Sequence, residues 1–266
     1  MATRSKFAPL RPLNLLAGLI YCFLLLPTLI VIPISFDGSG VISFPPLQPS
    51  LKLYREFLLD PSWMIAALHS LIVAVCSLAI ALSIGVPAAF ALGRRVFRGR
   101  SALSGLFIGP LVLPTVVIAL GTYLFFSYLH LTGTIPGLVL AHAAFITPFV
   151  FVTVSAGLRQ VDPLAETAAA LMGAGWFTIF FRVALPQLWH SVISAALLAF
   201  LMSFDEVVIA WFITDATTVT LPVKMYSSIQ WEVSPVLAAI STLLTAVSLL
   251  ICIVTYRIQS AEPPST

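Results

Sequence analysis

Two adjacent carboxylates, Asp205 and Glu206, interrupt an otherwise apolar stretch of the chain. A charged side chain near the centre of a bilayer costs at least ~2.5 kcal/mol, so such residues usually face a cavity or pair inside the protein. Successive residues on a helix point roughly 100° apart, so one carboxylate can face a pathway while its neighbour packs. We predict that Asp205, rather than Glu206, attracts a cationic solute. The alternative is a purely structural pair at the membrane interface.

Three aromatic residues follow this pair, namely Trp211, Tyr226 and Trp231. The face of an aromatic ring attracts a cation. Together with the two carboxylates, these residues form a candidate substrate pathway, which permits a cationic solute without requiring one.

Patterns for other chemistry are missing from the sequence. The four histidines lack metal-ligand spacing, and we interpret the isolated His142 as a packing residue that forms a hydrogen bond. There is no nucleophile elbow, no H-E-x-x-H and no phosphate-binding loop of the form G-x-x-x-x-G-K-[S/T]. We therefore expect no catalytic residue, no metal site and no cofactor in this chain.

The composition indicates a protein whose main solvent is lipid. Hydrophobic residues make up 60% of the 266 residues, charged residues only 9%, and the mean hydropathy is +1.08. A soluble domain carries roughly 25% charged residues to cover its wet surface. Backbone groups in hydrocarbon must bond to one another, and continuous apolar runs indicate helices rather than barrel strands. We predict an all-α polytopic membrane protein.

The apolar runs predict a single transmembrane domain over residues 1–266 with about six helices, since one span needs about 20 apolar residues. The predicted spans are 13–34, 64–92, 102–129, 135–158, 189–213 and 235–256. The first is interpreted as a retained anchor, because its apolar run is longer than that of a typical signal peptide. Pro110 and Pro114 in the third span predict a kink, either as tolerated irregularity or as a bend around a pathway.

The distribution of Lys and Arg predicts the orientation, because cytoplasmic loops are enriched in both. An even number of spans places both termini on one side of the membrane. The residues on that side are Arg4, Lys6, Arg11, Arg94, Arg95, Arg98, Arg100, Arg159, Arg182 and Arg257, against Lys52, Arg55 and Lys224 on the other. Both termini and the loop 159–188 are thus predicted to be cytoplasmic. The net charge of +3 marks topology and does not indicate nucleic acid as a partner.

The loop 159–188 contains a short predicted helix. Asp162 can cap it, Glu166 falls in its first turn, and Gly173 supplies a C-terminal stop. Between them, residues 168–172 are small and apolar, and Leu185-Pro186 ends the next helix before the fifth span. Such a helix in water can dock a partner protein or fold back on the bundle, and the residues alone leave these alternatives equal.

This segment resembles the "EAA" loop of permeases in binding-protein-dependent ABC importers. Ala168-Ala169, Gly173 and Val183-x-Leu185-Pro186 keep the spacing of that motif, with Thr167 at the position of its Glu and Glu166 one residue earlier. The resemblance implies that the helix docks into a cytoplasmic ATPase. The implied coupling residues are Glu166, Thr167, Ala168, Ala169, Leu171, Met172, Gly173, Leu185 and Pro186.

Further segments resemble the spermidine/putrescine-type permeases, among them Ser203–Val207 and Thr220–Val223. The resemblance implies a bacterial inner-membrane subunit that imports polyamines or a related small amine. It also implies two ATPase subunits that bind ATP and Mg²⁺, a second homologous permease, a solute-binding protein outside the membrane, and surrounding membrane lipid. The alternatives are an importer of another small organic solute, such as an amino acid derivative or organic phosphonate, and a secondary transporter driven by an ion gradient. A membrane-embedded enzyme is disfavoured by the missing catalytic pattern.

Overall fold

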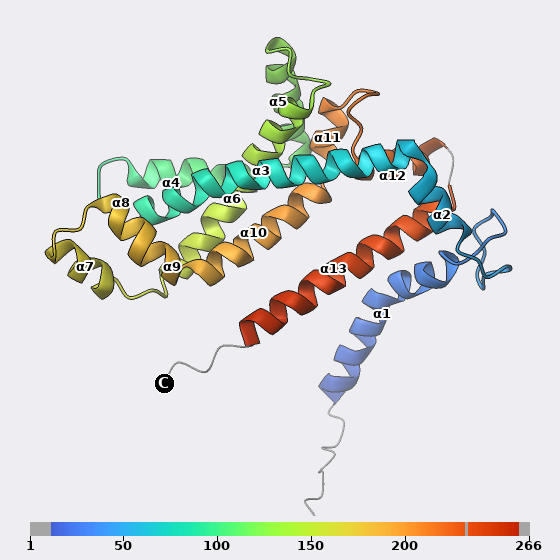
Figure 1. The fold of residues 1–266 in the computed structure, drawn as a ribbon, viewed down its shortest axis with the longest axis horizontal. Coiled ribbons are helices and arrows are strands. Elements are labelled where there is room, and N and C mark those ends of the chain that lie inside the picture. The colour runs from blue at the N-terminus through green and yellow to red at the C-terminus, as the bar shows by residue number, and fades with distance from the viewer. Residues whose placement is uncertain (1–11, 232–233, 261–266) are drawn as a thin grey trace, which may run out of the picture. The chain divides into compact units, whose positions relative to one another are not determined.

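The computed structural model describes residues 12–231 and 234–260, which form helices joined by turns and loops, with no β-strand among them (Figure 1). This confirms the predicted all-α fold. The chain divides into a terminal unit, built from its two ends, and a central unit, Ser62–Trp231.

The terminal unit contains three helices, α1 (Pro12–Ile34), α2 (Lys52–Leu59) and α13 (Val236–Ser260). Helix α3 (Pro61–Arg94) leads into the central unit. The other helices there are α4 (Arg100–Ile108), α5 (Thr115–Tyr128), α6 (Ile135–Leu158), α7 (Leu164–Leu171), α8 (Trp176–Ile179), α9 (Leu185–Gln187), α10 (Trp189–Phe204), α11 (Val208–Ile213) and α12 (Leu221–Trp231). A 3₁₀ turn, η1 (Gly109–Val112), continues α4, and a π-helical turn, η2 (Phe180–Ala184), joins α8 to α9.

In the terminal unit, the loop between α1 and α2 folds around the buried carboxylate of Asp37. This group accepts hydrogen bonds from the Ser43 hydroxyl and from the backbone N–H groups of Ser39 (2.9 Å) and Leu47 (3.2 Å). These donors, with Ser43 foremost, hold the pKa of Asp37 well below its ordinary value. The carboxylate thus acts as the structural centre of this loop.

Three described helices are long and apolar enough to cross a membrane, namely Asn14–Ile34, Pro61–Arg94 and Ile135–Leu158. Two bent pairs raise the number to five if each pair is one span, and Val236–Leu250 is a shorter apolar helix. One bent pair joins α4 and η1 to α5 at 108°, and the other joins the segment Trp176–Gln187 to α10 at 76°. The total of six spans remains a prediction.

Two predicted spans are not continuous helices in the structure. The span 102–129 breaks at Leu113, whose backbone is extended before Pro114. Proline lacks an N–H and disfavours helical geometry in the preceding residue, which accounts for the break and agrees with the predicted kink. The span 189–213 stops at Phe204 and restarts at Val208 as α11. The acidic pair lies in that second interruption.

Small residues allow α6 and α10 to pack closely at the centre of the unit. Ala195 and Ala199 of α10 are fully buried, and Gly157 of α6 lies against Ser191 with no room for a side chain. Small residues at such contacts are typical of helices that pack in membranes, where dispersion and close approach replace the hydrophobic effect.

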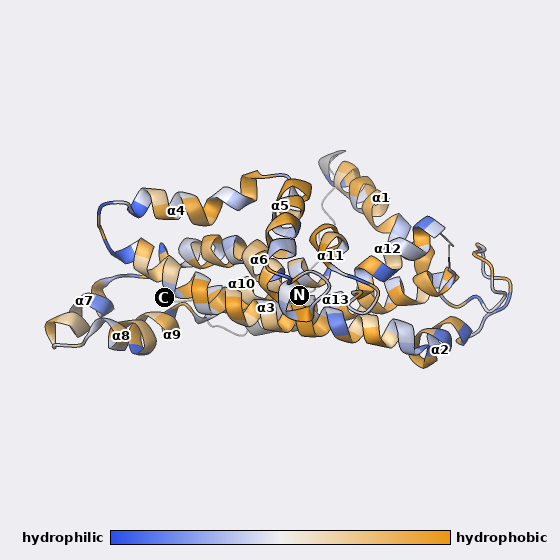
Figure 2. Ribbon diagram, turned by 90° about the horizontal axis from the view of Figure 1, so that it is seen from above, coloured by the Kyte–Doolittle hydropathy of each residue, from blue (hydrophilic) through white to orange (hydrophobic). Residues whose placement is uncertain are grey.

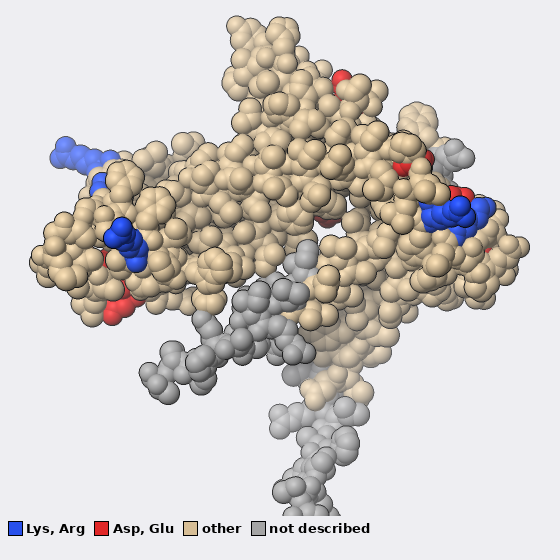
Figure 3. Space-filling view, in the orientation of Figure 1, with Lys and Arg blue, Asp and Glu red and all other residues tan. Residues whose placement is uncertain are grey.

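Hydrophobic residues make up most of the helices (Figure 2), and many of their large apolar side chains are exposed. On the face drawn in Figure 3, Lys and Arg of the central unit gather near the α3–α4 connection and α8, and the surface along the helices is mostly uncharged. This separation suits a bilayer around the helices and water at their ends.

Candidate functional site

Helix α7 lies where its sequence predicts a helix, with Pro163 rather than Asp162 as its N-cap residue. The carboxylate of Asp162 accepts the N–H of Leu164 at 2.9 Å. At the other end, Gly173 adopts φ +88°, and Ala174 N–H bonds back to Ala169 C=O at 3.0 Å. This closing pattern satisfies the last carbonyls of the helix and needs a residue that tolerates positive φ.

The side of α7 that faces away from the protein is apolar. Leu171 and Met172 are 85% and 83% exposed, and Leu164 is 70% exposed. Thr167, Ala168 and Gly173 are also exposed, whereas Ala169 is buried. In the following segment Leu185 is half-buried and Pro186 is exposed. Leu164, Ala168, Leu171 and Met172 form a small apolar knob, which the described residues of this chain leave uncovered.

Glu166 differs from the other predicted coupling residues, because it is buried and points into its own chain. Its carboxylate forms an ion pair with Arg94 at the end of α3, with Nη2–Oε1 at 2.9 Å and Nε within 3.1 Å of both oxygens. Arg94 also donates to the carbonyl of Val161 at 2.9 Å. The pair therefore fastens α7, and the loop before it, to α3.

Aromatic packing adds a second attachment of this region to α3. The guanidinium of Arg95 lies 3.9 Å from the ring centroid of Trp176 at the start of α8. Trp176 and Phe180 both pack on Phe90 of α3, with ring centroids 4.6 Å and 5.2 Å away. A displacement of α7 or α8 would thus be transmitted directly to the end of α3.

The acidic pair divides its roles at the break between α10 and α11. Asp205 is exposed at the C-terminal end of α10. Glu206 is buried, and its carboxylate accepts the N–H groups of Val208 (2.9 Å), Ile209 (2.8 Å) and Ala210 (3.1 Å). A carboxylate is favourable at a helix N-terminus, where N–H groups lack partners inside the helix. Glu206 therefore caps α11 and leaves Asp205 as the available acid.

A buried polar chain, which the sequence did not reveal, extends from this cap. His142 of α6 lies 4.0 Å from the Glu206 carboxylate through Nε2 and 3.0 Å from the Ser203 hydroxyl through Nδ1. Ser203 is in turn 3.0 Å from the Ser77 hydroxyl of α3. The structure thus agrees with His142 as a hydrogen-bonding packing residue. The spacing Ser203-x-x-Glu206 was the available signal, but the pairing with α3 and α6 requires tertiary structure.

The predicted aromatic residues do not form one cluster. Trp211 and Tyr226 meet edge to face, with ring centroids 5.2 Å apart. Trp231, at the end of α12, is 87% exposed. A separate cation–π contact places the Lys224 ammonium 4.6 Å from the Trp63 centroid. Within the part of the chain that the structure describes, no three His, Cys, Asp or Glu side chains gather in a way that could hold a metal ion.

Residues 85–262 match the family described as the inner membrane component of binding-protein-dependent transport systems. The chain belongs to this family. It is 35% identical over 263 residues to the putrescine transport system permease protein PotI of Escherichia coli (strain K12), covering 96% of this chain and 92% of that one. It is also 34% identical over 235 residues to the spermidine/putrescine transport system permease protein PotC of the same strain, with 88% of each chain covered.

Solved structures agree on the fold. A chain of a bacterial ABC transporter involved in import of the acidic polysaccharide alginate matches with TM-score 0.70 and 16% identity, and 94% of both chains is covered. A chain of the inward-facing methionine transporter MetNI matches with TM-score 0.60 and 18% identity, covering 76% of this chain and 99% of that one.

The chain is therefore an inner-membrane permease subunit of a binding-protein-dependent importer, and its family is one of transport components rather than enzymes. These findings confirm the predicted family, transport role and location. The roles of individual coupling and pathway residues, the orientation of the termini and the composition of the complex remain predictions.

Proposed function

We propose that the permease imports putrescine, spermidine or a related small amine as one subunit of an ATP-driven ABC importer. The observation that carries this proposal is the 35% identity to PotI across 96% of this chain. The names of PotI and PotC refer to putrescine and to spermidine/putrescine transport. The match to PotI extends over nearly the whole length of both chains.

The proposed complex contains this permease, a second homologous permease, two ATPase subunits and a solute-binding protein outside the membrane. ATP and Mg²⁺ bind to the ATPase subunits, because this sequence has no phosphate-binding loop. The binding protein delivers the solute to the outer ends of the helices. Closure of the two ATPases then switches the pathway between its inward-open and outward-open states.

In this proposal α7 is the coupling helix. Leu171 and Met172 enter an apolar groove of the ATPase, and the small Ala168 lets the two backbones approach closely, as is typical when a helix docks in a groove. Met adapts well to an irregular pocket because its side chain is flexible and polarizable. The Arg94–Glu166 pair then transmits the displacement of α7 to α3.

Asp205 is the proposed contact for the ammonium group of the solute. Its carboxylate is exposed at the break, while the carboxylate of Glu206 is occupied by three N–H groups. The C-terminal end of α10 adds a partial negative charge at the same place. Broken helices supply binding sites for ions and solutes in several transporter folds for this reason.

The test is uptake by the complete assembly in proteoliposomes, with labelled putrescine and spermidine beside a panel of amino acids and organic phosphonates. We expect amine uptake that requires both ATP and the binding protein. Uptake that continues without ATP on an ion gradient alone would support a secondary transporter instead. ATP-dependent uptake of an amino acid or a phosphonate, with no uptake of amines, would replace the solute but keep the importer.

A further inference from the structure

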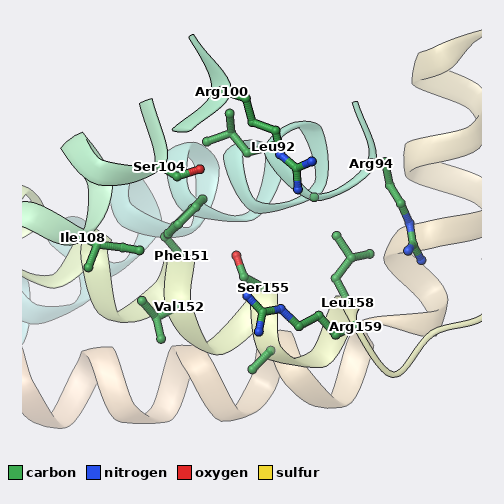
Figure 4. A pocket seen from close by; sticks show the side chains of 12 residues that line it. Leu92, Arg94, Arg100, Ser104, Ile108, Phe151, Val152, Ser155, Leu158 and Arg159 are labelled. Atoms are coloured by element: carbon green, nitrogen blue, oxygen red, sulfur yellow. The ribbon is translucent and has the colours of Figure 1, made fainter. Parts of the chain in front are cut away.

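A concave site lies between α4 and the end of α6, and neither the residues of α7 nor Asp205 line it (Figure 4). The cavity measures about 290 Å³. Two facing walls are formed by Arg100, Ser104 and Ile108 of α4 and by Val152 and Ser155 of α6 with Arg159 just after it, and the end of α3 (Leu92, Gly93 and Arg94) completes the lining. Each wall thus presents one face of a helix, with residues three or four positions apart.

Along the cavity, the side chains of both walls change from charged to polar to apolar. In Figure 4, Ile108 and Val152 lie at one end, the guanidinium group of Arg100 lies toward the other end, and that of Arg159 lies beside Ser155. The stacked rings of Phe107 and Phe151, with centroids 4.8 Å apart, hold the apolar ends of both helices together. The cavity therefore has a cationic end and an apolar end.

The two arginines at the cationic end are available to a ligand. Among the residues that the structure describes, neither Arg100 nor Arg159 forms an ion pair, whereas the nearby Arg94 is neutralised by Glu166. In Figure 4 the guanidinium groups of Arg100 and Arg159 lie between α4 and α6, and that of Arg94, which also lines the cavity, lies farther to the right. The positive-inside rule accounts for arginines near this loop. It does not account for two of them facing the same cavity.

We propose that this cavity binds the phosphate group of an anionic phospholipid from the inner leaflet. Guanidinium groups bind phosphate through charge-assisted hydrogen bonds, which the serine hydroxyls can supplement. Arg100 and Ile108 are separated by a helical rise of roughly 12 Å, enough to pass from the headgroup layer into hydrocarbon. The apolar end then receives the start of an acyl chain, which a free phosphate ion would leave empty.

The charge of the site selects the class of lipid and excludes the transported solute. A zwitterionic lipid would bring its own ammonium group near two guanidiniums, and an amine solute would be repelled by them. Basic pockets between helices at the cytoplasmic face are suited to anionic headgroups. Because Arg94 also lines this cavity, the bound lipid would lie beside the pair that holds α7 on α3.

The experiment uses the complete purified transporter and native mass spectrometry with phosphatidylglycerol or with phosphatidylcholine of the same chains. The wild type is expected to retain phosphatidylglycerol in preference to phosphatidylcholine. The double variant Arg100→Gln/Arg159→Gln should bind phosphatidylglycerol roughly 10- to 30-fold more weakly, as expected for two lost cationic contacts. The matched control is Arg98→Gln/Arg182→Gln, which removes two exposed arginines that do not line the cavity.

Equal retention by the wild type and the Arg100→Gln/Arg159→Gln variant would overturn the proposal, and so would an equal loss in the control. Inorganic phosphate at millimolar concentration distinguishes the two sources of this chemistry. Phosphate that binds without lipid and displaces phosphatidylglycerol would make the site one for a soluble anion. A Ser104→Cys probe on a background without natural cysteines tests for a covering protein. If this thiol were protected from alkylation in the delipidated complex, but not in the isolated permease, another subunit would cover the cavity. That result would also overturn the lipid assignment.

Discussion

At the scale of single residues, the buried and the exposed acids of this permease have different roles. Glu166 and Glu206 are both buried and saturated by partners, the first by a guanidinium and the second by three backbone N–H groups. Asp205 is exposed beside Glu206. Burial and saturation make the two glutamates structural, and they leave Asp205 as the acid that can respond to a solute.

Removal of one partner from the Arg94–Glu166 pair should destabilise the attachment of α7. Loss of a single member of a buried ion pair costs about 3 kcal/mol, because the remaining charge is left without compensation. Glu166→Ala is therefore expected to lower the thermal stability of the complex and to uncouple ATP hydrolysis from uptake. In a cycle built from Arg94→Leu and Glu166→Leu, the double variant should cost less than the sum of the two single variants. Additive losses in this double-mutant cycle would contradict a direct interaction.

Substitution of the two neighbouring acids should give opposite results. Glu206→Gln cannot accept all three N–H groups, and each lost bond to a charged acceptor costs about 2 kcal/mol, so the melting temperature should fall. Asp205→Asn should leave the melting temperature almost unchanged but raise the KM for amine uptake, since it removes the charge and keeps the shape. Thermal unfolding and uptake kinetics, measured on the same preparations, check both. An unchanged KM in Asp205→Asn would remove this residue from the pathway.

At the scale of elements, short helices and breaks carry the proposed function, whereas the long helices carry the fold. Helix α7 contributes an exposed apolar knob, and the break between α10 and α11 contributes an exposed acid. Small residues allow α6 to pack closely on α10, which ends at this break. Changes at the knob should therefore affect assembly, and changes at the packing contact should affect folding.

A charge on the knob should prevent docking of the ATPase without unfolding the permease. Leu171→Glu and Met172→Glu place a carboxylate on side chains that are 85% and 83% exposed, so the fold has little to lose. We expect at least a tenfold loss of ATPase co-purification, since burial of an unpaired charge in an apolar groove is costly. The matched control is Val96→Glu, at an apolar residue that is 91% exposed in the α3–α4 connection. Normal co-purification of both variants would exclude the knob from the interface.

A side chain at Gly157 should separate α6 from α10. A Cβ at this position would overlap Ser191, so Gly157→Val is expected to destabilise the permease by about 1–3 kcal/mol through overpacking. The control is Gly105→Ala in α4, where a Cβ meets nothing within 4 Å and alanine favours the helix. Thermal unfolding in detergent compares the two. Equal stability of both variants would show that the helices can move apart at no cost.

At the scale of the whole molecule, the asymmetry of Lys and Arg is the basis for its orientation in the membrane. Ten such residues fall on the predicted inner side and three on the outer side. The loop that contains α7 is on the inner side in this arrangement, where a cytoplasmic ATPase can reach it. The lipid proposed between α4 and α6 depends on the same arrangement, because its headgroup would lie at the inner surface.

Reporter fusions test this orientation. A fluorescent reporter that folds only in the cytoplasm should be active when fused after residue 266, and an alkaline phosphatase reporter there should be inactive. Insertion of the phosphatase reporter near Gly40, in the loop between α1 and α2, should give the reverse result. Activity of the phosphatase at the C-terminus would place α7 outside and would contradict both the coupling and the lipid proposals.

Local chemistry in the sequence determined several features correctly. The lack of charge required helices in lipid, Asp162 and Gly173 set the ends of α7, and Pro114 produced a bend. Each of these depends on backbone geometry or solvation over a few residues. The spacing of Ala168, Gly173 and Pro186 also led to the right family, because that spacing is itself local.

Tertiary structure alone decided which side chains have partners. The sequence placed Glu166 among the docking residues, but Arg94, 72 residues earlier, turns it inward. It also predicted one continuous helix over 189–213. In the structure the carboxylate of Glu206 accepts N–H groups at the start of α11, and this cap stabilises a break. Likewise, Arg100 and Arg159 looked like ordinary markers of topology until α4 and α6 placed them around one cavity. The Arg94–Glu166 pair and the lining of this cavity depend on contacts between distant segments, which propensity and periodicity do not encode.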